Sequence, residues 1–521
     1  MHVSHPLIKE SAVEDREYQT SLARICGKES TLVVIPTGMG KTIIALRVVA
    51  DTLHKGATKA LILAPTRPLV EQHRDVLQDM MPTVRVASMT GGTVPDKRVD
   101  VWNRNTVIVS TPQVIANDLD KGRYGLGDVG VVVYDEAHRG VGSYSYVRVA
   151  EHYHPYRRLS MGITASPGSD NKRIMEVCEN LRLFRIEVRT EEDPDVAPYV
   201  HRIEMKTLEL DLPEDLMEII GVLRDLLDKY VDELIKLRLL DDRSVATAKR
   251  LLVLGKTLQA RAAHEKGSYT VFRALTVQAM AMKLLHAIGL AETQGTTALS
   301  RFLDRLEEEK VQDGSSRATR ELLANEGYDR LREMLSKTRT EHPKVSRVMT
   351  LVSRQVDSEP DSRVLVFTHY RDTCEMVADR LARIPSARVG RLIGQAGHDG
   401  LKQKGQADVL RQFREGIVNV LVATSVGEEG LDVANTDMVL FYEPVPSEIR
   451  SIQRRGRTGR FSDGQVHILI AKGTRDEAYQ NSSLNKEKRM RRRLEDLDRE
   501  LRSRRQIEER ARSQSSLASF R

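Results

Sequence analysis

Short, continuous apolar runs alternate with helical patterns over residues 31–166. The runs cover 32–35, 60–63, 107–109 and 129–134, and each ends in a polar or glycine-rich turn. A parallel strand that is buried on both faces gives such an unbroken run, whereas a half-exposed strand alternates. The pattern predicts an α/β domain over residues 1–200, with ligands at the carboxyl ends of its strands.

The same texture returns in the second half of the chain, at 364–367, 420–422, 439–442 and 466–470. It predicts a second α/β domain over residues 343–480. The stretch between the two domains, 201–342, has leucines and isoleucines at helical spacing from Leu216 to Leu237, and further helices are expected over 244–263, 268–288 and 319–336. The expected fold is therefore two parallel-sheet domains with an all-helical insert between them.

The last segment, 481–521, is mostly charged. A basic run at 486–493 precedes Leu494, Leu497 and Leu501, which share one helical stripe. We expect a solvated helix that frays into disorder.

Composition narrows the classes of protein that the chain can belong to. Hydrophobic residues make up 40% and charged residues 30%, as in a soluble globular protein, and no apolar run suggests a membrane span. The three cysteines are scattered, which supports neither a disulfide framework nor a zinc site and indicates a reducing cytoplasm. The net charge of +7 is mild, but the positive charge gathers in the insert and near the C-terminus, which favours a polyanionic partner in the nucleoid.

Residues 36–42 nearly match a phosphate-binding loop, with Ile35 where a first glycine is usual. The loop follows an apolar run and precedes a helical pattern, as such a loop requires. Lys41 is placed to bridge the phosphates of ATP, and Thr42 to bind Mg²⁺. The residues expected to bind ATP here are Pro36, Thr37, Gly38, Met39, Gly40, Lys41 and Thr42.

Asp135-Glu136-Ala137-His138 follows the apolar run 129–134. Asp135 is placed to hold Mg²⁺, and Glu136 to polarise the attacking water as a general base. Farther along, Arg457 and Arg460 lie three residues apart among glycines and are candidates for arginine fingers. Together the three segments predict a nucleotide-hydrolysing motor.

These motifs resemble those of superfamily-two DEAH-box helicases, whose two RecA-like domains bind ATP between them. The strings at 64–73, 135–139, 164–170, 423–432 and 442–450 are similar, more narrowly, to archaeal Hef and the Fanconi anaemia group M helicases. The resemblance implies nucleotide contacts for Arg16, Gln19, Gly430, Asp432 and Gln453. It also implies that Thr164 and Ser166 couple hydrolysis to domain movement.

The resemblance further implies a nucleic-acid track. Hydroxyls, backbone amides and one arginine suit phosphate contacts without base reading. The track residues are Thr66, Arg67, Gly92, Thr111, Thr368 and Thr424. One face of an insert helix adds Lys249, Arg250, Lys256 and Arg261, which are expected to grip a duplex or junction arm but also fit an ordinary solvated face.

Two expectations concern partners. Hef-type proteins often carry a C-terminal nuclease, and no such motif is found here, so we expect any nuclease to be a separate chain. Gln514, Leu517 and Phe520 resemble a sliding-clamp-binding peptide, although a chance match is about as probable.

The sequence favours an ATP-dependent helicase or translocase acting on forked or branched DNA. Backbone-tracking motifs leave a double-stranded-RNA-stimulated ATPase open. A non-catalytic scaffold that holds a nuclease or clamp at forks is disfavoured by Lys41, Glu136 and Arg460.

Overall fold

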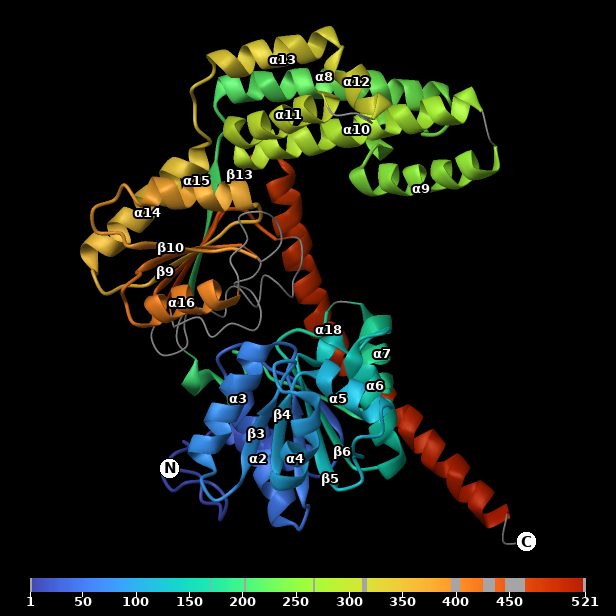
Figure 1. The fold of residues 1–521 in the computed structure, drawn as a ribbon, viewed down its shortest axis with the longest axis vertical. Coiled ribbons are helices and arrows are strands. Elements are labelled where there is room, and N and C mark those ends of the chain that lie inside the picture. Colours follow the sequence, from blue (N-terminus) through green and yellow to red (C-terminus); the bar gives the residue numbers. More distant parts are fainter. Residues whose placement is uncertain are drawn as a thin grey trace.

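The computed structural model describes residues 2–168, 170–200, 203–265, 268–311, 316–394, 403–424, 436–445 and 464–518. Two parallel sheets with covering helices lie one above the other in Figure 1, and a bundle of helices lies beyond the second sheet. Both sheets and the helical insert between them in the sequence agree with the predicted fold class.

The first sheet has the strand order β3-β4-β2-β5-β6-β1-β7, and every neighbouring pair is parallel. Its apolar runs are buried on both faces, which is why they are unbroken. The strands are β1 (Thr31–Val34), β2 (Lys59–Leu63), β3 (Val86–Met89), β4 (Val107–Ser110), β5 (Val129–Asp135), β6 (Leu159–Thr164) and β7 (Arg185–Val188). The helices are α1 (Glu17–Cys26), α2 (Lys41–His54), α3 (Arg67–Met80), α4 (Pro95–Arg104), α5 (Pro112–Asp120), α6 (Ser145–Tyr153) and α7 (Asn171–Leu181).

The insert is a helical bundle with a leucine-rich core of its own. The central helix α10 contacts α8, α9, α11 and α12. The segment expected as one helix over 319–336 is two helices, because Asn325 caps a new one by accepting from Gly327 N at 3.1 Å. The helices are α8 (Glu214–Lys236), α9 (Ala248–His264), α10 (Tyr269–Gln294), α11 (Thr296–Val311), α12 (Arg317–Leu323) and α13 (Glu326–Lys337).

Helix α10 is long and apolar enough, by length and composition, to cross a membrane, which the search for apolar runs in the sequence did not reveal. Its most apolar window is 67% buried inside the protein. The helix lies at the centre of the bundle, and a core helix that is covered over most of its surface needs little polar face.

The second sheet has the order β10-β11-β9-β12-β13-β8, again all parallel. Its strands are β8 (Ile203–Leu210), β9 (Val364–Phe367), β10 (Val389–Leu392), β11 (Val420–Ala423), β12 (Met438–Phe441) and β13 (Gly464–Ala471). Among the described residues of this domain, the helices are α14 (Pro343–Ser358), α15 (Arg371–Leu381) and α16 (Gln403–Arg414).

Strand β8 differs from the sequence prediction, which assigned residues 201–342 to the helical insert. All eight of its residues pair with β13, so this segment forms an edge strand of the second sheet before the chain enters the bundle. All eight of its residues are at least partly exposed, as expected at a sheet edge.

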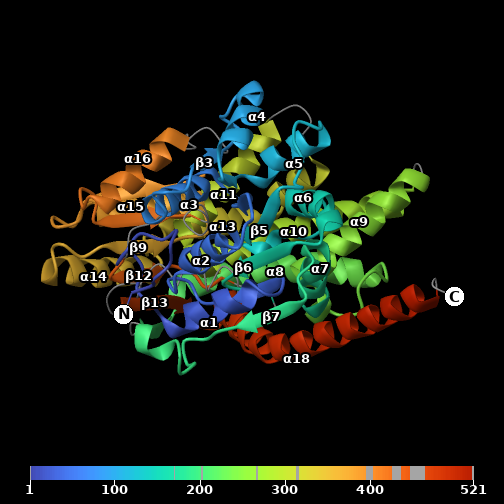
Figure 2. The same cartoon turned by 90° about the horizontal axis from the view of Figure 1, so that it is seen from below.

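The charged segment near the C-terminus forms the long helix α18 (Arg475–Ala518), which runs from the insert past the first sheet (Figures 1 and 2). It contacts α10 and β13 near its start, and β7 and α7 farther along. Leu494, Leu497 and Leu501 are buried in the core of the first domain, and Asp498 Oδ1 accepts from Ile186 N at 2.8 Å. The helix was expected to be solvated, but its leucine stripe packs against the first domain.

The docked stripe predicts a local change in stability. Leu497→Ala should destabilise the docking of α18 by about 2 to 5 kcal/mol, because it leaves a cavity at a nearly fully buried site. Hydrogen exchange should show faster exchange of the Ile186 amide. Leu484→Ala is the control, since Leu484 lies on the same helix but is 38% exposed, and equal effects of the two changes would contradict the docking.

Candidate functional site

The candidate phosphate loop lies between β1 and α2. Gly38 has φ 84° and Gly40 has φ 69°, conformations that favour glycine. Gly40 is the N-cap of α2 and forms no side-chain cap, and no acidic residue occupies the first turn of the helix. The first amides of α2 are thus open to an anion, which a helix N-terminus attracts.

Helix α1 packs against this loop through its first residues. The Tyr18 hydroxyl donates to Met39 O at 2.9 Å, and the Gln19 amide nitrogen donates to the same oxygen at 3.2 Å. A Cβ at Gly40 would lie 2.5 Å from that nitrogen, so a larger residue there would displace the Gln19 side chain. Arg16 stacks over the Tyr199 ring at 5.0 Å. The segment expected to contact the base is therefore in direct contact with the loop expected to hold the phosphates.

Asp135 ends β5, between β2 and β6 in the middle of the first sheet. Both of its carboxylate oxygens have protein partners: His73 Nε2 lies 2.9 Å from Oδ2, and Glu136 N donates to Oδ1 at 3.0 Å. A carboxylate held in this way and a threonine hydroxyl from Thr42 suit Mg²⁺, which takes few protein ligands and completes its shell with phosphates and water. The described residues contain no cluster of three or more His, Cys, Asp or Glu side chains that could hold a metal.

Glu136 has a left-handed backbone, with φ 48°, which is uncommon for a residue other than glycine and is a form of strain that gathers at functional sites. Its carboxylate lies 3.9 Å from Lys41 Nζ and 3.4 Å from His138 Nδ1. Burial alone would raise the pKa of Glu136, but Lys41, His138 and Arg139 outweigh it and lower that pKa to about 2. The structure therefore brings the loop lysine and the candidate base together, with the base ionised at neutral pH.

The two residues expected to couple hydrolysis to movement lie beside this carboxylate. Thr164 ends β6, and its hydroxyl is 3.0 Å from His138 Nδ1 and accepts from Ser166 N at 3.2 Å. His138 therefore contacts Glu136 and Thr164 with one nitrogen, which links the ends of strands β5 and β6.

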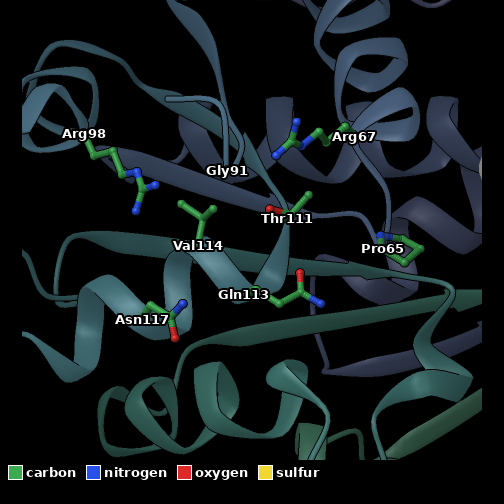
Figure 3. Close-up of a pocket in the computed structure, with 8 residues that line it drawn as sticks. All are labelled: Pro65, Arg67, Gly91, Arg98, Thr111, Gln113, Val114 and Asn117. Atoms are coloured by element: carbon green, nitrogen blue, oxygen red, sulfur yellow. The ribbon is translucent and has the colours of Figure 1, made fainter. Parts of the chain in front are cut away.

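A polar groove of about 380 Å³ opens on the same domain (Figure 3). Arg67 and Arg98 approach it from two sides with Thr111 between them. Helix α3 begins at Arg67, capped by Thr66, and α5 begins at Pro112, so two helix N-termini lie at the groove. The lining residues are Pro65, Arg67, Gly91, Arg98, Thr111, Gln113, Val114 and Asn117.

Other predicted track residues are placed differently. Gly92 adjoins the groove residue Gly91 and is exposed. Thr368 and Thr424 are buried at the carboxyl ends of β9 and β11. The Thr368 hydroxyl donates to Tyr370 O, two residues farther along the chain, at 3.4 Å.

Several predicted residues cannot be placed. Gly430, Asp432, Gln453, Arg457, Arg460 and Phe520 lie outside the described residues. Gln514 and Leu517 fall in the part of α18 where only the backbone is described.

The basic face of α9 is exposed at the far side of the insert from α13 (Figure 1). Among the described residues, Lys249, Arg250 and Lys256 form no ion pair, whereas Arg261 pairs with Glu265 at 3.2 Å. Many other cations of the bundle are paired, such as Arg243 with Asp232 and Arg317 with Glu321. Unpaired cations gathered on one helix are available to phosphates.

Sequence reasoning missed three polar residues of the groove, Arg98, Gln113 and Asn117, and the histidine that contacts Asp135. Arg98 is fixed by the buried Asp118 at 3.1 Å. His73 does leave a signal in the sequence, because it interrupts an apolar stripe between Val70 and Leu77.

Known families match three stretches of the chain. The DEAD/DEAH box helicase family matches residues 16–174, and the helicase conserved C-terminal domain matches 343–462. A helical bundle described as that of a putative ATP-dependent RNA helicase matches 215–342.

Among individual proteins, the chain is 37% identical over 502 residues to a putative ATP-dependent RNA helicase of Methanocaldococcus jannaschii, covering 95% of this chain and 63% of that protein. It is 32% identical to an ATP-dependent DNA helicase of Neurospora crassa, covering 90% of this chain and 42% of that protein. The mouse Fanconi anemia group M protein homolog is 31% identical, over 90% of this chain and 25% of that protein. The chain thus spans less than two thirds of the length of these relatives.

A solved structure matches over its whole length. The crystal structure of the Pyrococcus furiosus Hef helicase domain superposes with a TM-score of 0.71 at 42% identity, covering 92% of this chain and all of that one. Both sheets and the bundle agree with this likeness. The chain belongs to the Hef family of DEAD/DEAH-box helicases, which are ATP-hydrolysing enzymes.

Proposed function

We propose that the chain is an ATP-driven DNA translocase that acts at forks and other branched DNA. The observation that carries the proposal is the groove on the first domain, where two arginines and two helix N-termini converge on the domain that also carries the candidate ATP site. Such a groove suits a phosphate backbone and reads no sequence. The name of the Neurospora relative, an ATP-dependent DNA helicase, supports DNA as the substrate.

In this proposal the first domain performs the chemistry. Lys41 and the open amides of α2 bind the triphosphate, while Thr42 and Asp135 would hold Mg²⁺, which would neutralise charge on the transferring phosphate. Binding draws Lys41 from Glu136 to the phosphate oxygens. Loss of that cation raises the pKa of Glu136, so that its carboxylate becomes a better acceptor for a proton of the attacking water.

The remaining roles complete a cycle. Gln453, Arg457 and Arg460 from the second domain, with Gly430 and Asp432, are proposed to contact the nucleotide. Thr164 and Ser166 would couple a change at Glu136 during hydrolysis to movement of the domains, through the contacts of His138 with Glu136 and Thr164. The unpaired cations of α9 would hold a junction arm, and a clamp or nuclease partner stays a prediction.

RNA is the second candidate substrate, because the Methanocaldococcus relative and the helical-bundle family carry names of RNA helicases. ATP turnover of the full chain with forks, four-way junctions, linear duplex DNA and duplex RNA separates the two. Greatest stimulation by forks or junctions supports the proposal, and greatest stimulation by RNA overturns it.

Lys41→Ala should lower ATP turnover by about 100-fold or more, because it removes a charge aimed at the reacting phosphates. Binding of fork DNA should persist, since Lys41 does not line the groove. Lys55→Ala, at the exposed far end of α2, is the control. Unchanged DNA-stimulated turnover in Lys41→Ala would refute the assignment of the phosphate loop.

Changing Lys249, Arg250 and Lys256 to Gln should weaken binding to junctions more than to single strands. The slope of log affinity against log salt should fall by about 0.9 for each phosphate that the variant no longer neutralises. Changing Arg243, Arg317 and Lys337 to Gln removes the same charge from paired positions and is the matched control. If both triple variants behave alike, α9 makes no specific contact with the junction.

A further inference from the structure

His73 occupies an unusual position on α3. The buried stripe of this helix consists of Val70, His73 and Leu77, so an imidazole stands where an apolar side chain would pack. His73 is only 6% exposed, and burying a polar ring without a partner is costly. Its Nε2 lies 2.9 Å from Asp135 Oδ2, which offsets that cost.

Among the described residues, the hydrogen bond to Asp135 is the contact that compensates for burying this imidazole. The other ring nitrogen, Nδ1, is buried without a hydrogen-bond partner among the described residues. A carboxylate only accepts hydrogen bonds, so Nε2 donates. With Glu136 N on Oδ1, the donation to Oδ2 fixes the plane of the Asp135 carboxylate and leaves its remaining lone pairs in a defined direction.

The helix that carries His73 also begins at the groove. Thr66 caps α3, and Arg67 lines the cavity. His73 follows Arg67 by six residues, which is about 9 Å along a helix axis. Between these two residues, Glu71 accepts from Ser88 Oγ of β3 at 3.0 Å, which holds α3 to the sheet at an intermediate point. One rigid element therefore contacts both the groove and the Asp135 carboxylate.

We propose that His73 is a positioning residue for ATP hydrolysis, which aligns Asp135 for the metal–nucleotide complex and, through α3, makes that alignment depend on a strand in the groove. A phosphate backbone bound at the N-terminus of α3 pulls on Arg67 and shifts or stiffens the helix. His73 passes that change to Asp135. The inference that His73 aligns Asp135 depends only on the geometry of the ATP site. The inference that a bound strand affects this alignment rests on the proposed function of the groove.

The alignment is tested on the full chain without nucleic acid. Binding of Mn²⁺ in the presence of a non-hydrolysable ATP analogue is measured by electron paramagnetic resonance. His73→Leu should weaken Mn²⁺ binding by about tenfold or more, as loss of a hydrogen bond to a metal-binding carboxylate does. Val70→Ala, in the same stripe but without a polar contact, should leave Mn²⁺ binding unchanged.

Two amide variants test the geometry even if His73→Leu fails to fold. The amide nitrogen of Gln lies as many bonds from Cα as histidine Nε2, whereas that of Asn is one bond shorter. His73→Gln should therefore keep Mn²⁺ binding near that of the wild-type chain, and His73→Asn should lose it. Equal affinity in the two amide variants, or an equal loss in Val70→Ala, overturns the proposal.

The coupling is tested by the ratio of strand-stimulated to basal ATP turnover. We expect this ratio to fall toward one in His73→Asn and to be restored in His73→Gln. A ratio that stays at the wild-type value in His73→Asn refutes the coupling. If neither DNA nor RNA stimulates the wild-type chain, the proposed function fails and the coupling fails with it, while Mn²⁺ binding still decides whether His73 positions Asp135.

Discussion

A buried ion pair joins three parts of the molecule. Lys344, at the start of α14, donates to Asp476 at 2.5 Å, and both side chains are fully buried. Asp476 also accepts from Ala471 N, while Lys344 lies 3.5 Å from Thr293 O at the end of α10. Removing either partner would leave a buried charge unpaired, at a cost of about 3 to 5 kcal/mol. The pair therefore helps to hold the second sheet, the bundle and the start of α18 together.

The fold was predictable where its signal is local. Unbroken apolar runs indicated the central strands of both sheets, because those strands are covered on both faces. Strand β10, Val-Gly-Arg-Leu, is too short and mixed to stand out, and β8 mixes apolar and charged residues rather than forming an unbroken apolar run. The partner of β8 follows the whole insert in sequence, so its pairing leaves no local pattern. The leucine stripe of α18 predicted a helix, but not the domain that would cover it.

Some residues of the candidate site were predictable from local sequence, and others were not. Glycines, Lys41 and the Asp135-Glu136 pair were predictable, since phosphate and metal chemistry restricts residue types at short spacing. The contact of His73 with Asp135 was not, because it arises from strand order: α3 follows β2, and β2 neighbours β5 in the sheet. The groove has the same origin, since its residues come from separate strand-to-helix turns that only the sheet brings together.

Helix α18 would restrict the domain movement that the proposed cycle requires. It is fastened to the second domain at Asp476 and to the first at Leu494, about 27 Å apart along its axis. A helix that is attached to both domains restricts their relative movement more than a flexible linker would. Separation of the two domains would therefore require α18 to bend or one of its two attachments to open.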